Sequence, residues 1–193
     1  MNGKRLIAAA LAVALLQIGF LGWIVAGRAA ILRNGAEVLL EVEPVDPRDL
    51  LRGDYVALGY EISRIPVKLV ANIPPDQFSS GDQPLVVRLG KGMDGYWHPQ
   101  AAWLDAAPAP AGAGGVDIVG HIGAGWDLRD GNATLSPDYG IERFYLPEGV
   151  GLAIQNDMRV RPFGVKVAVS KRGQAQVKAL LDGGRTLFEE PLY

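Results

Sequence analysis

Charged residues that could bind a ligand are densest between positions 43 and 61, where Pro44 and Pro47 end a predicted strand and Gly53 permits a sharp entry into the next. Arginine side chains can hold a carboxylate or a phosphate through paired hydrogen bonds, and carboxylates can hold a cation. A charged turn whose side chains bond the backbone and one another explains the same pattern, so both interpretations stay open. The charged residues of this segment are Asp46, Arg48, Asp49, Arg52 and Asp54.

A second polar segment surrounds a predicted strand at 141–146. One hypothesis pairs Arg143 and Glu148 with the first charged segment. Their partners there would be Arg52 and Asp54, so that the two segments meet in space. The alternative is two separate clusters that each stabilise a turn. The candidate residues of the second segment are Glu142, Arg143, Tyr145 and Glu148.

The sequence matches few of the motifs that known catalytic and metal sites require. The chain has no cysteine, which excludes a disulfide framework and a thiol nucleophile, and its two histidines, His98 and His121, are too few for a three-histidine zinc site. We expect both histidines to be ordinary strand residues. Glycine-rich stretches at 112–115 and 120–125 lack the Gly-Lys-Ser/Thr of a phosphate loop and are interpreted as turns. We assign no catalytic residue, metal or cofactor, and we lean toward a non-enzymatic protein.

Strands must hold these segments in place. The sequence predicts a mainly β domain over 37–193, which forms an antiparallel barrel or sandwich with at most short helices. In 37–43, for example, apolar residues alternate with glutamates, which is strand periodicity with one wet face. The predicted strands are 37–43, 54–62, 85–89, 96–103, 116–122, 141–146, 165–170 and 175–181. Hairpin turns are predicted from glycine-containing connectors at 90–95, 171–173 and 182–184.

Two further segments of this domain have their own interpretation. Residues 148–158 could form a short helix with Glu148 near its positive end. The Ala-, Pro- and Gly-rich stretch 106–115 has no apolar period, and we expect a flexible surface loop between two halves of the domain.

An uncharged apolar stretch precedes the domain at 6–26. As a helix it would span roughly 31 Å, which matches a hydrocarbon core of about 30 Å. Lys4 and Arg5 precede it, so the positive-inside rule places residues 1–5 in the cytoplasm and the domain outside, although Arg28 and Arg33 weaken this asymmetry. We favour an uncleaved signal anchor. A cleaved signal peptide, with small residues near position 27, is the alternative.

The charge of the chain argues against one class of partner. Its 193 residues carry 19 Lys and Arg against 21 Asp and Glu, for a net charge of -2. A nucleic-acid-binding domain normally carries a basic patch and a high pI, so we expect no nucleic-acid partner.

At positions 53–60 the chain reads Gly-Asp-Tyr-Val-Ala-Leu-Gly-Tyr, which matches the motif of the GDYXXLXY family. The flanking segment 44–52, the later segment 139–149 and the layout of an apolar segment before a domain of this length also resemble that family. The resemblance implies a bacterial membrane-anchored protein, of a family whose members are often encoded beside or joined to polytopic membrane proteins. It carries over no catalytic residue. The named residues of the motif here are Gly53, Asp54, Tyr55, Leu58 and Tyr60.

These observations lead to an expected function. We expect a single-pass protein of the bacterial inner membrane that contacts the bilayer through residues 6–26 and exposes its domain to the periplasm or other extracytoplasmic space. Its expected role is a non-enzymatic accessory or binding subunit for a polytopic membrane protein or an envelope component.

An enzymatic alternative is a membrane-anchored Ser/Lys hydrolase, which would resemble signal peptidases because these also combine an anchor with an exported β-rich domain. Such an enzyme needs a hydroxyl nucleophile beside a lysine of lowered pKa. No recognisable nucleophile motif surrounds any serine. The candidate serines are Ser63, Ser79, Ser80, Ser136 and Ser170, and the candidate lysines are Lys68 and Lys166.

Overall fold

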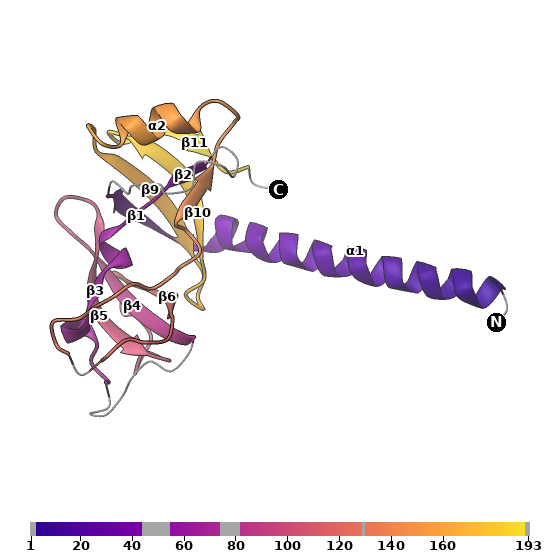
Figure 1. Cartoon of the computed structure of the whole chain (residues 1–193), viewed down its shortest axis with the longest axis horizontal. Coiled ribbons are helices and arrows are strands. Elements are labelled where there is room, and N and C mark those ends of the chain that lie inside the picture. Colours follow the sequence, from indigo (N-terminus) through magenta and orange to yellow (C-terminus); the bar gives the residue numbers. More distant parts are fainter. Residues whose placement is uncertain (1–2, 44–54, 74–81, 129, 192–193) are drawn as a thin grey trace.

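The computed structural model of the chain describes residues 3–43, 55–73, 82–128 and 130–191. A long helix projects from a mainly β domain, as the sequence predicts (Figure 1). The helical elements are α1 (Gly3–Asn34), η1 (Glu61–Ser63), η2 (Val67–Leu69) and α2 (Gly151–Asp157). The strands are β1 (Ala36–Val42), β2 (Tyr55–Ala57), β3 (Ile65–Pro66), β4 (Gln83–Lys91), β5 (Trp97–Leu104), β6 (Gly115–Ile122), β7 (Thr134–Leu135), β8 (Arg143–Tyr145), β9 (Phe163–Val169), β10 (Ala175–Asp182) and β11 (Arg185–Glu189).

The larger sheet has the strand order β1-β9-β10-β11 and is antiparallel throughout. Its register follows from the alternation in β1, since Val38 and Leu40 are buried and lie opposite Val167 and Val165 of β9. These side chains stand on the face of the sheet that forms the core.

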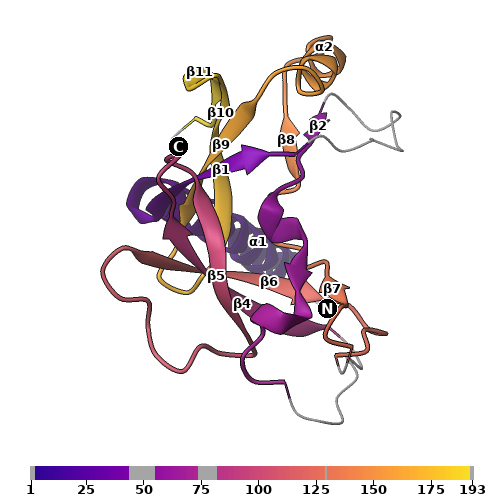
Figure 2. The ribbon, with the colours of Figure 1, turned by 90° about the vertical axis from the view of Figure 1, so that its left-hand side faces the viewer.

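A smaller sheet with the order β5-β4-β6 and two short ribbons, β2-β8 and β3-β7, complete the β structure. Buried residues of all these units belong to one continuous apolar core. Among the described residues every sheet is open, so the arrangement corresponds to the sandwich alternative and not to a closed barrel (Figure 2).

The three predicted hairpins are confirmed, because β4 and β5, β9 and β10, and β10 and β11 are antiparallel neighbours. At the turns, Gly95, Gly173 and Gly183 have positive φ values, which glycine adopts without strain. The stretch 106–115 joins β5 to β6. Both strands flank β4 in one sheet, so this connection does not separate two halves of the domain as we had expected.

The strand predicted over 54–62 is much shorter in the structure, where β2 ends at Ala57 and η1 begins at Glu61. Local hydrogen bonds explain the difference. The Tyr60 N–H donates to Ser63 Oγ at 3.1 Å, and the Ser63 N–H donates to the Tyr60 carbonyl at 3.0 Å, so the chain turns where the alternation suggested extended backbone.

The second polar segment differs from its prediction in the same way. Its strand begins at Arg143, because the Glu142 carboxylate accepts the Tyr139 N–H at 2.7 Å and holds residues 139–142 in a turn. The helix expected over 148–158 is confirmed only for α2, since a turn closed by the Val150 N–H and the Pro147 carbonyl occupies its expected first residues.

Helix α1 is 32 residues long and apolar enough to cross a membrane. It continues past the predicted end at position 26, and its last turns contact β9 and β10. There Ala29 and Leu32, three residues apart on one helix face, are buried. The last turns of the helix therefore pack against the domain by one face.

Candidate recognition site

The two polar segments lie side by side, because β2 and β8 are antiparallel neighbours. Tyr55 is opposite Tyr145, and Ala57 is opposite Arg143. The two motif segments therefore meet in space. The specific pairs with Arg52 and Asp54 cannot be placed, because positions 44–54 lie outside the described residues. The same holds for the candidates Asp46, Arg48, Asp49 and Gly53.

Two tyrosines join these segments by reciprocal hydrogen bonds in the core. The Tyr60 hydroxyl donates to the Ile141 carbonyl at 2.8 Å, and the Tyr139 hydroxyl donates to the Ile62 carbonyl at 2.9 Å. Burial raises the pKa of both phenols, so they remain neutral donors. The last tyrosine of the motif is thus a structural residue. We call this pair of hydrogen bonds the tyrosine clasp.

Leu58 also has a structural role. Its side chain is buried, and its N–H donates to the Glu142 carbonyl at 2.9 Å, which extends the β2-β8 pairing by one residue. On the opposite edge of β2, the Ala57 N–H donates to Oε1 of Gln155 at 3.0 Å. This buried glutamine of α2 covers the edge of β2, and nothing in the sequence indicates that contact.

The outward face of the ribbon carries the remaining motif residues. The rings of Tyr55 and Tyr145 are 6.0 Å apart, and the Arg143 guanidinium lies 5.4 Å from the centre of the Tyr55 ring. Tyr145 is 66% exposed. Tyrosine and arginine at such positions are the residue types enriched in binding hot spots. We call Tyr55, Arg143 and Tyr145 the Tyr-Arg face.

A hollow of about 310 Å³ adjoins this face and is lined by Asp138, Gly140, Glu142, Arg143 and Tyr145. The carboxyl groups of Asp138 and Glu142 interact directly here. Burial is the main cause that raises the pKa of Glu142, and the contact with Asp138 raises it further, against the N–H of Tyr139. Two adjacent acids in a hollow favour a cationic guest. Asp138 and Tyr139 were missing from our candidates; the partner of the Tyr139 hydroxyl, Ile62, is distant in sequence, whereas the contact of Asp138 with Glu142 is local.

Glu148 lies apart from these contacts. Its side chain is exposed in the turn between β8 and α2, and the ion pairs found among the described residues do not include it. Its predicted pairing with the first charged segment stays a prediction.

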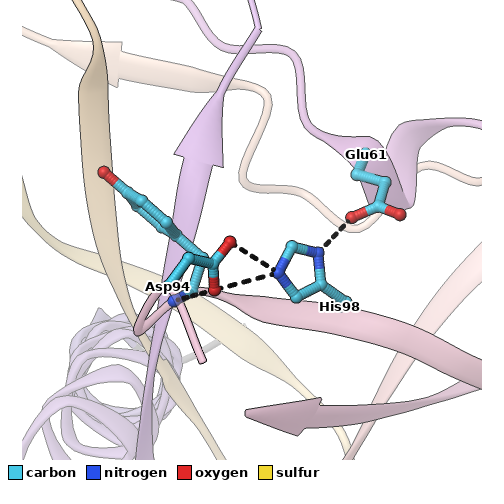
Figure 3. Close-up of polar contacts among 4 residues, drawn as sticks. Glu61, Asp94 and His98 are labelled. Carbon is cyan, nitrogen blue, oxygen red and sulfur yellow. Dashed lines mark hydrogen bonds and ion pairs between the residues drawn. The ribbon is translucent and has the colours of Figure 1, made fainter. Parts of the chain in front are cut away.

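A separate polar cluster surrounds His98 at the start of β5 (Figure 3). Its Nδ1 lies 2.6 Å from Oε2 of Glu61, and its Nε2 lies 3.1 Å from Oδ2 of Asp94. With a carboxylate on each ring nitrogen, the imidazolium ties η1 to the β4-β5 hairpin. His98 is therefore more than the ordinary strand residue that we expected. The hydrogen bond that the ring donates to Glu61, and next the one to Asp94, raise the pKa of His98.

The described residues hold little that fits the hydrolase alternative. Ser63 accepts the Tyr60 N–H, and Ser170 accepts the N–H groups of Arg172 and Gln174, so both hydroxyls serve turns. None of the hydrogen bonds among the described residues joins a serine to a lysine. The part of the chain that the structure describes also contains no group of three metal-ligating side chains.

Stability should fall as the pH rises through the pKa of His98. A raised folded-state pKa means that the stabilisation is complete below the ordinary value of 6.5 and is lost above the folded value. Because the three side chains are 38–54% exposed, we expect a loss below about 1 kcal/mol. Urea unfolding of the wild type and His98→Gln between pH 5.5 and 9 measures it. A pH-independent difference between the two proteins would contradict the assignment.

Comparison with known proteins gives one family. The sequence profile of the GDYXXLXY protein family matches residues 17–180, which includes the second half of α1 and nearly the whole domain. No curated protein and no solved structure matches the chain.

Proposed function

The chain belongs to the GDYXXLXY protein family, and from this membership and the geometry above we propose that it is a single-pass membrane protein that binds a neighbouring polytopic membrane protein. In this proposal α1 crosses the bacterial inner membrane with its N-terminus in the cytoplasm. The β domain lies outside the cytoplasm and acts as a non-enzymatic accessory subunit.

The continuity of α1 is the observation that carries the proposal. Its residues before Ala29 are exposed, including Leu15, Leu16 and Trp23, which are 69–73% exposed. Such a length of apolar helix needs a non-aqueous surrounding, and its length suits a bilayer. One face of its final turns packs against the domain, so a helix in the membrane would hold the domain directly at the membrane surface.

The proposed orientation rests on the charges at the two ends of the apolar stretch. Lys4 and Arg5 precede it on the side that would lie in the cytoplasm. Arg28 and Arg33 follow it on exposed positions of α1, where their side chains can reach lipid headgroups.

The proposed binding surface is the Tyr-Arg face. Its position on a ribbon that is anchored to the core by the tyrosine clasp holds exposed aromatic and cationic groups in fixed places. A rigid surface loses little conformational entropy on binding.

Two measurements on the full chain in its native membranes test the proposal. A C-terminal reporter that is active only outside the cytoplasm should be active, and Leu15→Arg with Leu16→Arg should abolish this activity, because each central arginine opposes insertion by about 3 kcal/mol. Matched Leu15→Val and Leu16→Val changes should preserve it. Chemical cross-linking should recover a polytopic protein. The proposal would be refuted if a C-terminal reporter that works only in the cytoplasm were active, or if cross-linking recovered no membrane protein.

A further inference from the structure

Strand β8 has an open outer edge. Backbone groups of successive strand residues point to opposite sides. Because the Leu58 N–H bonds the Glu142 carbonyl, the N–H and C=O groups of Arg143 and Tyr145 point away from β2. The corresponding group on β2, the Ala57 N–H, indeed faces outward and is covered by Gln155. No such cover is found for the outer edge at Arg143 and Tyr145 among the backbone hydrogen bonds of the described residues.

Parts of other sheet edges are covered, although no backbone hydrogen bond among the described residues covers the outer edge of β11. The end of β1 receives Gly59, and β5 receives the Ala71 N–H at its Ala102 carbonyl. The edge of β6 is bonded by Gly173 and Asp138. Proteins commonly cover such edges, since an open one pairs with another chain. The open edge of β8, which carries the exposed side chains of Arg143 and Tyr145, is therefore a candidate for strand addition.

The acidic hollow lies beside this edge. Its lining comes from positions 138–145, includes Arg143 and Tyr145 of β8, and contains none of the described residues of β2. Asp138 Oδ1 accepts the Gly140 N–H and Glu142 Oε1 accepts the Tyr139 N–H. The two carboxyl groups also bond each other, so a basic guest would replace this contact between like groups. The Arg143 guanidinium is directed over the Tyr55 ring.

We propose that the outer edge of β8 binds an extended segment of the partner membrane protein, and that a lysine or arginine of this segment lies between Asp138 and Glu142. This inference rests on the proposed function and specifies how the partner is held. The four backbone groups of Arg143 and Tyr145 supply the hydrogen bonds of an added strand, and the two carboxyl groups select a basic side chain. The exposed ring of Tyr145 covers the side chains of the added segment.

A chain without cysteine allows a position-specific test in native membranes. The exposed Glu148 is replaced, as Glu148→Cys in the full chain, and labelled with a cleavable photoreactive reagent that leaves a mass tag on whatever it contacts. We expect the tag on one segment of one other membrane protein, with a lysine or arginine within about four residues of the tagged position.

Two matched pairs of variants, made in the labelled chain, test the backbone and the charge separately. Tyr145→Pro removes the ring and the outward N–H, whereas Tyr145→Thr removes only the ring. The ladder to β2 is kept in both, because proline is tolerated where the N–H faces outward. We expect at least tenfold less tagging for Tyr145→Pro than for Tyr145→Thr. Asp138→Asn with Glu142→Gln should lower tagging at least tenfold, and Asp130→Asn, a remote exposed acid, should leave it unchanged.

The remaining outcomes contradict the inference. Equal tagging of the two Tyr145 variants would exclude strand addition, and equal tagging after loss of the two acids would exclude the basic side chain. A tag on a second copy of this chain, or on residues 44–54 of the same chain, would show that the edge binds another occupant and would contradict the proposed partner. If cross-linking recovers the partner while these variants have no effect, only this inference fails; if wild-type chain recovers no partner, the proposed function itself fails. Unfolding curves of all variants exclude loss of the fold.

Discussion

Replacing Tyr60 with alanine is expected to lower the free energy of unfolding by about 4 kcal/mol, because it removes a buried aromatic ring and leaves a cavity. Tyr60→Phe keeps the ring and leaves the Ile141 carbonyl without its donor, so we expect a loss of about 1–2 kcal/mol. Urea unfolding of the full chain in detergent, followed by near-UV circular dichroism, measures both.

The partner in the clasp supplies the control for this prediction. Tyr139→Phe removes the bond to the Ile62 carbonyl and should cost about the same as Tyr60→Phe. The two bonds join the same two segments, so the double variant should deviate from additivity by about 0.5 kcal/mol or more. Strictly additive losses, or a Tyr60→Phe protein as stable as the wild type, would contradict the clasp.

Replacing Gly173 with alanine should cost about 3 kcal/mol. Its φ of +82° lies in the left-handed region, where a side chain costs about 1–2 kcal/mol. A Cβ there would also overlap Cγ2 of Val119 and lie 3.0 Å from the Val119 N, which donates to the Gly173 carbonyl. The neighbouring backbone must shift, at a further cost of about 1–3 kcal/mol. Thermal and urea unfolding both measure the change.

Gly183 provides a matched control in the next hairpin. It also has a positive φ, but a Cβ there would meet nothing within 4 Å. Gly183→Ala should therefore cost only the conformational part, about 1–2 kcal/mol. If both alanine variants lose equal stability, the contact between the β9-β10 turn and β6 is not the cause.

The strands with clear alternation were predictable because the spacing of apolar residues within one short segment determines which of its side chains are buried. Val38, Leu40 and Val42 identify β1 and its buried face directly from their spacing. The segment 54–62 has the same apolar spacing, yet a single side chain, Ser63, bonds the Tyr60 backbone and bends the chain. Periodicity does not register such a local competitor for backbone hydrogen bonds.

The candidate site was predictable in its residue types and not in its partners. Alternation correctly puts Arg143 and Tyr145 on one face, whereas their neighbour Tyr55 comes from a strand 90 positions earlier. The same distance hides the bond from Tyr139 to Ile62. Hydropathy likewise ends the first helix near position 26, since it cannot detect that Ala29 and Leu32 find a buried surface on distant strands.

The absence of a linker between α1 and the domain has a consequence for affinity. Helix α1 extends to Asn34, eight residues beyond position 26, which as a helix amounts to about 12 Å. With α1 in a bilayer, the domain could neither swing far nor rise from the lipid surface. Domain and partner would then diffuse in one thin layer, where confinement raises their effective concentration. A short strand edge, too weak to capture a free peptide from solution, would be sufficient to hold a neighbour in the same membrane.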